Sequence, residues 1–421
     1  MSPYTWWSRV PNLGKGNRLC ITARIQHLIV SWRDRLFDFV VIGGGPSGSY
    51  CTQRLAKRGF KVAQLEEHQS IGKPVECTGL VSRRVTSMVK TDSVVNKVHG
   101  ANIYFPDGNH IRIGKEEETM VLERDRFDQD AAAMSIGNGA ELMLNARVKD
   151  IRRQDRKMKI TMRRDGNIEE VEALAVVGAD GANSITRKVL FPDQRFRRIV
   201  SAYQIDGADR MEDQDNVNVF LGNKFSNGYF AWGTPAGDFS RIGTAGFGLT
   251  REKFNYLYKR YLNPNKISIT GGPIPISFLR RPYGDGALLV GDAAGIVKPL
   301  SGGGIYTGMV SGEKAAITME RAYEKEDFSE GTLSLYNKLW KKELGAELKR
   351  DFRIQKLYSR ITDTSFNIIG RKITTERMTH LINTIGDIDY PSRVVLKMLI
   401  RNPSIVRNVL FPRKEKNAER N

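Results

Sequence analysis

Cysteine is scarce in this sequence, and long hydrophobic runs are missing. The three cysteines, Cys20, Cys51 and Cys77, are an odd number without the spacing of a metal site, so we expect no bound metal and reduced thiols in a cytoplasmic protein. No stretch of about 18 apolar residues occurs, so we expect no transmembrane helix. Internal repeats and low-complexity tracts are also absent, and 40% of the residues are hydrophobic. These features indicate a globular protein of two or three lobes.

Acidic residues are fewer than basic ones, with 47 Asp+Glu against 66 Lys+Arg and a net charge of +19. Such an excess indicates an anionic partner, namely nucleic acid, an anionic membrane surface or a phosphorylated substrate. Residues 1–36 form a basic extension of uncertain status, either a membrane-contacting segment or the product of a misassigned start. Residues 392–411 mix apolar side chains with Lys397, Arg401 and Arg407. This pattern fits either a helix on an anionic bilayer or a packed helix with a solvated face.

A glycine-rich turn follows the first clear strand pattern. Residues 37–42 (FDFVVI) predict a buried parallel strand, and a helical pattern follows the turn. Between them, Gly43, Gly45 and Gly48 have the spacing Gly-x-Gly-x-x-Gly, with Ser47 inside the turn. The first glycine permits the tight turn, the second lets the backbone approach a pyrophosphate, and the third lets the helix pack on the strand. The start of the helix therefore predicts a site for a dinucleotide-type anion.

Three later strand patterns each end in an acidic residue, at Glu66, Asp180 and Asp292. A carboxylate at Glu66, after the second strand of such a unit, can accept hydrogen bonds from ribose hydroxyls. Each aspartate taken alone could simply cap a helix. In this order after the glycine turn, the set resembles the FAD-dependent hydroxylase and reductase superfamily, which shares the fold of para-hydroxybenzoate hydroxylase. The resemblance implies that FAD is the cofactor.

Three further segments narrow the resemblance, at 74–80 (PVECTGL), 122–128 (LERDRFD) and 299–305 (PLSGGGI). With the turns above, they resemble the geranylgeranyl reductase family over roughly residues 37–400. They are most similar to the archaeal enzymes that saturate the geranylgeranyl chains of membrane glycerolipids.

The resemblance implies a set of residues around the cofactor. Beside the flavin end, Cys77 and Thr78 are expected at the isoalloxazine ring, and Gly302, Gly304 and Ile305 under its pyrimidine edge. Arg124 is expected at the phosphates or the ribityl chain, and Asp292 at the ribityl and pyrophosphate side. Asp180 and Gly181 are expected near the pyrophosphate, and Val148 at the adenine through its main chain. Backbone N–H groups at a helix start stabilise the negative charge that two-electron reduction places at the pyrimidine edge. Alternatively, Arg124 is a surface residue, Cys77 a small core residue and Val148 a plain strand residue.

An aromatic segment follows at 228–235 (GYFAWGTP). The family often has Tyr-x-Trp-x-Phe-Pro along its lipid pocket, and here Tyr229 lies one residue farther from Trp232 while Thr234 replaces the phenylalanine. The resemblance implies that Tyr229 and Trp232 contact the substrate, and ordinary core aromatics are the alternative. The departure from the pattern puts the preference for chain length or head group in doubt.

The patterns and the resemblance together predict a mixed α/β (α+β) fold. A Rossmann-like FAD-binding domain is expected over 37–75, 115–195 and 276–325. A largely antiparallel β-sheet substrate domain is expected over 76–114 and 196–275, and a C-terminal helical region over 326–421.

The implied function is an FAD-dependent reductase that saturates geranylgeranyl chains by hydride transfer, with a proton from Cys77, Tyr229 or water. The chain has one dinucleotide turn, so the electron donor, NAD(P)H or a reduced ferredoxin-like protein, is expected to dock transiently. We expect a cytoplasmic protein at the membrane surface that binds a prenyl lipid and no nucleic acid. The alternatives are a reductase of geranylgeranyl diphosphate or another prenyl compound, an aromatic monooxygenase, and a prenyl-binding protein without catalysis.

Overall fold

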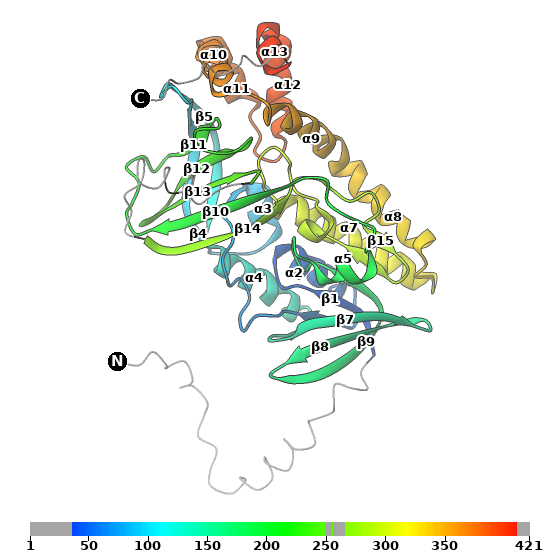
Figure 1. Ribbon diagram of the computed structural model, residues 1–421. Coiled ribbons are helices and arrows are strands. Elements are labelled where there is room, and N and C mark those ends of the chain that lie inside the picture. Colours follow the sequence, from blue (N-terminus) through cyan, green and yellow to red (C-terminus); the bar gives the residue numbers. More distant parts are fainter. Residues whose placement is uncertain (1–35, 249–254, 256–265, 411–421) are drawn as a thin grey trace, which may run out of the picture.

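The computed structural model describes residues 36–248, 255 and 266–410, so the extension expected over 1–36 lies outside the described residues apart from Leu36. The chain is built on two sheets (Figure 1). The strands of the first sheet run in the order β15 (Tyr283–Gly284), β16 (Ala287–Leu289), β9 (Asn167–Gly178), β1 (Leu36–Ile42), β2 (Val62–Leu65) and β6 (Glu141–Met143). From β16 to β6 the strands are parallel, and β7 (Arg147–Gln154) and β8 (Lys157–Arg164) extend β9 as an antiparallel layer.

The strand predicted over 37–42 lies in the middle of this sheet. Five of its six residues are buried, because helices cover the sheet and a central parallel strand must be apolar throughout. The covering helices are α2 (Pro46–Ala56), α4 (Arg124–Gly137), α5 (Ile185–Leu190), α7 (Ile305–Glu324) and α8 (Glu330–Trp340). At the crossing of α2 and α7, a Cβ on Gly312 would lie 2.7 Å from the carbonyl oxygen of Ser47. The two helices can therefore approach this closely only with glycine there.

The second sheet is largely antiparallel, as predicted. Its order is β14 (Lys266–Pro275), β10 (Ile199–Gly207), β13 (Phe239–Gly246), β12 (Phe230–Ala236), β11 (Asn216–Leu221), β4 (Val94–Tyr104), β5 (His110–Leu122) and β3 (Leu80–Ser82), with β4 and β11 parallel. The short helix α3 (Arg83–Met88) follows β3.

One predicted domain boundary needs correction. The break between 114 and 115 falls inside β5, which pairs with β4 on both sides of the break and belongs to the second sheet. At this boundary, Gly114 lies opposite Gly100 next to an irregularity in the register of β4 and β5. A Cβ on Gly100 would lie 2.0 Å from the carbonyl oxygen of Ile113. The glycines thus mark a close backbone approach inside a strand pair, which a sequence pattern does not distinguish from a turn.

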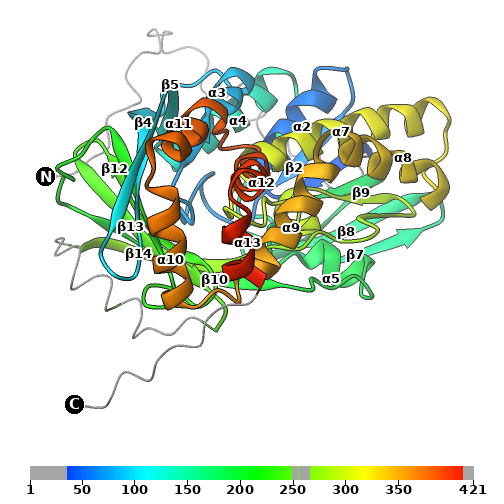
Figure 2. The ribbon, with the colours of Figure 1, turned by 90° about the horizontal axis from the view of Figure 1, so that it is seen from above.

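The C-terminal region is helical, as predicted. After α8 come the π-helical turn η3 (Lys341–Gly345), α9 (Ala346–Tyr358), α10 (Asp363–Ile373), α11 (Glu376–Ile385), α12 (Pro391–Arg401) and α13 (Pro403–Leu410). Helix α9 runs from the first sheet towards the second, and α10–α13 gather beyond the end of the second sheet (Figures 1 and 2). Phe105 and Ile111 of the second sheet pack with Phe366 and Ile369 of α10, which holds these helices in place.

The mixed α/β fold with a Rossmann-like unit, a second sheet and C-terminal helices is therefore confirmed. Among the described residues, no helix combines the length and the apolar character needed to cross a bilayer.

Candidate functional site

A cavity of about 1430 Å³ lies where the carboxyl edge of the first sheet faces the second sheet and the C-terminal helices. All but one of the residues predicted from the sequence line it. These are Gly43, Gly45, Ser47, Glu66, Cys77, Thr78, Arg124, Val148, Asp180, Gly181, Tyr229, Trp232, Asp292, Gly302, Gly304 and Ile305. Gly48 lies behind the wall, where a Cβ would meet the carbonyl oxygen of Gly43 at 2.2 Å. That contact agrees with the packing function predicted for Gly48.

The glycine turn between β1 and α2 forms an open cradle. Gly43 has a φ of +114°, and a Cβ there would lie 2.3 Å from the carbonyl oxygen of Ala179. A Cβ on Gly45, by contrast, would meet no atom within 4 Å, because this residue faces the cavity at the start of α2. Open space beside a helix N-terminus fits an anionic group such as a pyrophosphate.

Glu66 lies at the end of β2, beside the cradle. Its Oε2 accepts a hydrogen bond from the backbone N–H of Gly44 at 2.7 Å, and its Oε1 accepts one from the N–H of His68 at 3.0 Å. Nδ1 of the His68 ring also lies 2.6 Å from Oε1. A carboxylate offers about four acceptor positions, so about one remains for a hydroxyl group in the cavity. Glu66 therefore stiffens the turn, and its predicted contact with ribose stays a prediction.

The two aspartates are used differently. Asp180 accepts hydrogen bonds from the hydroxyl of Ser184 at 2.6 Å and from the N–H of Thr186 at 2.9 Å, so its carboxylate caps the start of α5. Burial raises the pKa of Asp180, against the effect of these bonds. Asp292 faces the cavity beside Gly304, and burial raises its pKa to about 6, opposed by the charge of Arg124. Asp292 is thus the carboxylate more available to a bound hydroxyl group.

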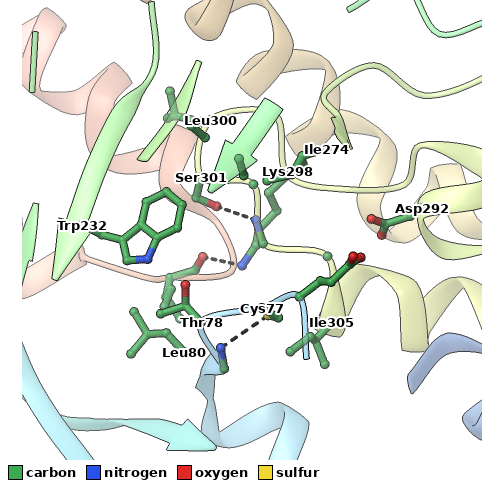
Figure 3. Close-up of a pocket in the computed structure, with 18 of the residues that line it drawn as sticks. Cys77, Thr78, Leu80, Trp232, Ile274, Asp292, Lys298, Leu300, Ser301 and Ile305 are labelled. Atoms are coloured by element: carbon green, nitrogen blue, oxygen red, sulfur yellow. Dashed lines mark hydrogen bonds between the residues drawn. The ribbon is translucent and has the colours of Figure 1, made fainter. Parts of the chain in front are cut away.

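The Cys77–Thr78 segment is held by two residues that sequence reasoning missed. Gln204 of β10 accepts hydrogen bonds from the hydroxyl of Thr78 at 2.7 Å and from the indole N–H of Trp232 at 3.3 Å. Arg241 of β13, whose side chain is 3% exposed, donates from Nη1 to the carbonyl oxygen of Thr78 at 2.8 Å. A glutamine and an arginine inside strand patterns were the available signals, but only the fold shows that both are buried. Figure 3 shows Cys77, Thr78 and Trp232 around one space.

Arg124, at the start of α4, is not a surface residue. It donates to both oxygens of Asp128 at 3.0–3.1 Å. Burial lowers the pKa of Arg124, but its interactions with Asp128 and Cys77 outweigh this effect and hold the pKa above its usual range. A fixed positive charge therefore lies at the cavity wall next to Cys77, as a contact with an anionic cofactor requires.

The loop before α7 is fixed by hydrogen bonds to neighbouring segments. Tyr229 donates from its hydroxyl to the carbonyl oxygen of Pro299 at 3.1 Å. Lys298, a third residue that sequence reasoning missed, donates from Nζ to the carbonyl oxygen of Ile388 at 2.7 Å and to Asp389 at 3.1 Å. Figure 3 shows Lys298 on this loop and Ile305 where α7 begins. The backbone that was predicted to run under the flavin is thus anchored to the link before α12.

The far end of the cavity is apolar. Tyr229, Phe230 and Trp232 line its middle, so the aromatic wall predicted there is present. Beyond them the lining comes from the C-terminal helices, with Ile361, Phe366, Ile369, Val394, Met398 and Ile405.

The residues present fit FAD. The open cradle at Gly45 accommodates a pyrophosphate, Glu66 and Asp292 offer acceptors for hydroxyl groups, and the glycines at 302–304 let backbone approach a ring without intervening side chains.

Comparisons with known proteins agree with this geometry. Residues 37–217 match the pyridine nucleotide-disulphide oxidoreductase family. An uncharacterized protein of Methanocaldococcus jannaschii is 35% identical over 378 residues, which cover 86% of this chain and 95% of that protein. A digeranylgeranylglycerophospholipid reductase of Methanothrix thermoacetophila is 30% identical over 391 residues, covering 88% of this chain and 97% of that enzyme.

Solved structures show the same similarity. The crystal structure of a geranylgeranyl bacteriochlorophyll reductase-like protein from Thermoplasma acidophilum superposes with a TM-score of 0.81 at 25% identity, covering 89% of this chain and 99% of that one. A flavoprotein/dehydrogenase from Cytophaga hutchinsonii has a TM-score of 0.65 at 15% identity and covers 89% of this chain and 98% of its own, which shows the shared fold alone.

Proposed function

The chain belongs to the geranylgeranyl reductase family of FAD-dependent oxidoreductases, and from that premise we propose that it saturates the double bonds of geranylgeranyl chains on membrane glycerophospholipids. The single observation that carries the proposal is the continuity of the cavity. One space joins the glycine cradle to an apolar end lined by α10, α12 and α13. Its volume of about 1430 Å³ exceeds the roughly 300–1000 Å³ of an ordinary small-molecule site, so it can hold a dinucleotide and a long apolar chain together.

When bound, FAD supplies the hydride chemistry that no amino-acid side chain provides. The residues of the chain have three tasks. Glycines and Glu66 shape the cradle, Gln204 and Arg241 fix the segment that carries Cys77 and Thr78, and the aromatic wall keeps water from the alkene. Tyr229 has a hydroxyl at the cavity wall and can hold a proton there.

The outer face of α12 supports an action at a membrane surface. Leu396 and Ile400 are exposed apolar residues, with relative accessibilities of 37% and 75%, and Lys397 and Arg401 are exposed beside them. The sequence has no acidic residue between 391 and 410. The opposite face of the same helix lines the apolar end of the cavity through Met398. A helix of this kind on an anionic bilayer would put the cavity directly behind the lipid contact.

The enzymatic test uses the FAD-loaded protein reduced with dithionite under anaerobic conditions. A digeranylgeranyl glycerophospholipid and geranylgeranyl diphosphate are incubated separately, and mass spectrometry follows the gain of two hydrogens per double bond. We expect the glycerophospholipid to be saturated faster. Faster saturation of the diphosphate would move the proposal to that substrate. Oxygen-dependent formation of peroxide or a hydroxylated product without saturation would indicate a monooxygenase, and a purified protein that takes up no flavin would indicate a prenyl-binding protein.

Two variants of neighbouring residues on α12 test the cavity. Met398→Trp fills its apolar end, whereas Lys397→Trp adds the same side chain on the outer face. We expect Met398→Trp to reduce the number of double bonds saturated per chain and Lys397→Trp to leave it unchanged. Equal product patterns would show that the chain does not lie in this end of the cavity.

Flotation with liposomes tests the membrane contact. Replacing Lys397 and Arg401 by glutamate changes the net charge by −4, and the same change at Arg156 and Lys325, exposed on the first lobe, is the matched control. We expect the α12 variant alone to lose binding to anionic vesicles. Equal binding by the two variants would argue against docking through α12.

We propose two candidate electron donors, NAD(P)H and reduced ferredoxin. Flavin reduction followed by absorbance under anaerobic conditions, with each donor in turn, separates them.

A further inference from the structure

Helix α9 carries a polar stripe on a buried face. Glu347, Asp351 and Gln355 follow one another at intervals of four residues, with exposures of 3%, 0% and 0%. Residues four apart lie on the same face of a helix, so all three point into the protein. A buried helix face is normally apolar, and a buried carboxyl group costs free energy unless it is paired. Packing alone therefore does not explain the stripe.

Two members of the stripe have partners, and the middle one does not. Glu347 accepts hydrogen bonds from the N–H of Ser392 at 2.9 Å and from Arg350 at 2.5 Å. Gln355 donates to the carbonyl oxygen of Gly228 at 3.2 Å. Within the part of the chain that the structure describes, neither buried carboxyl oxygen of Asp351 has a hydrogen-bond partner. A native protein keeps such a group rarely, and often for a functional reason.

The stripe is held against Tyr229. Tyr358, at the end of α9, donates to the backbone oxygen of Tyr229 at 2.6 Å, and Gln355 holds the residue before it. The phenol of Tyr229 is 1% exposed, lines the cavity and lies against Gly302, where an added Cβ would be 3.3 Å from its oxygen. Burial raises the pKa of this phenol well above its usual value, and Asp351 raises it further. Asp351 is thus close enough to influence the pKa of a phenol that touches both the cavity and the glycine loop.

We propose that Asp351 stores the proton that restores the hydroxyl of Tyr229 each time a double bond is saturated. The inference rests on the proposed reductase function, which supplies the hydride from reduced FAD. The O–H bond of Tyr229 breaks as a C–H bond forms on the second alkene carbon, and its electron pair stays on the phenol oxygen. The O–H bond of Asp351 then breaks and its proton reaches that oxygen through one bridging water molecule, because Asp351 and Tyr229 share no direct hydrogen bond. The carboxylate then takes a proton from water. Tyr229 is the catalytic residue, and Asp351 acts through it.

The surroundings of Asp351 keep it protonated. Burial raises its pKa to about 8, and the neighbouring charge of Glu347 raises it too, while Lys298, Arg350 and the nearby backbone N–H of Ser392 lower it. Lys298 enters from the glycine loop and is itself paired with Asp389. Because the Tyr229 phenolate is a stronger base than the Asp351 carboxylate, proton transfer from Asp351 to Tyr229 is downhill. Asp351 is therefore protonated at pH 7 and loses its proton as the pH rises through about 8.

The test compares Asp351→Asn, which keeps the size of the side chain, with Glu347→Gln one turn away. Saturation of a digeranylgeranyl glycerophospholipid by dithionite-reduced holoenzyme is followed by mass spectrometry between pH 6 and pH 9. We expect the wild-type rate to fall above about pH 8. Asp351→Asn should be about tenfold slower or more at pH 7, which is within the range for removing an acid from a proton-transfer step. Its rate should not fall further above pH 8. Glu347→Gln should keep the fall but move it to lower pH, because it removes a charge that raises the pKa of Asp351.

A second readout needs no turnover. Infrared titration of the substrate-free holoenzyme should show a protonated carboxyl band at pH 7 that disappears above about pH 8, is absent in Asp351→Asn and is retained in Glu347→Gln. If Asp351→Asn fails to fold, the infrared band of the wild type and the pH shift of the Glu347→Gln rate profile still test whether a protonated Asp351 takes part. A wild-type enzyme that saturates no prenyl lipid refutes the proposed function and the relay with it. Saturation with an Asp351→Asn profile like that of the wild type, or no protonated band at pH 7, refutes the relay alone.

Discussion

Arg241→Met tests how the Cys77 segment is held in place. Nη1 of Arg241 donates to the carbonyl oxygens of Thr78 at 2.8 Å and Leu122 at 2.6 Å, so one buried side chain ties this segment to the end of β5. Its Nε lies 3.8 Å from Asp206. Methionine keeps much of the volume and removes both hydrogen bonds and the charge. The variant should therefore release the Cys77 segment without emptying the core.

The size of the effect follows from these contacts. Hydrogen bonds from a charged donor contribute about 1.5–3 kcal/mol each, so the two bonds together are worth roughly 3–6 kcal/mol. Methionine offsets part of this, because it removes the cost of burying a guanidinium group. The pKa of Arg241 is already lowered by that burial. We expect a net loss of about 3 kcal/mol, and a fall in melting temperature of roughly 5 °C for a chain of this length.

Thermal unfolding and FAD titration by flavin fluorescence provide the assay. Arg152→Met, at a side chain that is 81% exposed on β7, makes the same substitution without a buried contact and serves as the control. Arg241→Met should lower both the melting temperature and the FAD affinity, whereas Arg152→Met should change neither. Equal behaviour of the two variants would refute the view that Arg241 positions this side of the site.

Further variants test the cradle, the buried carboxyl and the loop anchor. Gly45→Ala should leave the melting temperature unchanged and weaken FAD binding, because its Cβ would enter the open space of the cradle. Gly48→Ala should lower the melting temperature, because its Cβ would meet the backbone. A lower melting temperature for Gly45→Ala than for Gly48→Ala would contradict this reasoning. Asp351→Asn should gain about 3 kcal/mol over the wild type between pH 5 and pH 7 in urea unfolding, at about 1.4 kcal/mol per pH unit. The wild type loses stability as the pH rises from 5 to 7, because the pKa of Asp351 is raised from 3.8 to about 8 in the folded state. A difference in unfolding free energy between variant and wild type that does not change with pH would show that Asp351 is ionised. Lys298→Met should cost about 3 kcal/mol in urea unfolding by leaving the buried carboxylate of Asp389 without this partner, and a change below about 1 kcal/mol would show that the pair is not holding the loop.

Much of the fold could be predicted from local patterns. The apolar strand over 37–42, the turn after it and the following helix are contiguous in the chain, and their physical requirements are met by neighbouring residues. The helical C-terminal region and the antiparallel second sheet also follow from their patterns. The boundary at 114 could not be predicted, because a glycine inside a paired strand has the same signature as a glycine in a turn.

The candidate site divides in the same way. Gly43, Gly45 and Glu66 could be found from their spacing, since the chemistry of a pyrophosphate cradle depends on residues close in sequence. Gln204 and Arg241 could not, because a polar residue in a strand pattern is indistinguishable from a surface residue until distant segments cover it.

The sequence by itself determined the glycine cradle, the cofactor and the family, because each depends on short motifs in a fixed order. Only the tertiary structure decided what surrounds the reactive end of the cavity. Asp351 lies 122 positions from Tyr229 along the chain, and α9 brings its buried carboxyl close enough to raise the pKa of that phenol. Such a pair is created by packing, and no local pattern encodes it.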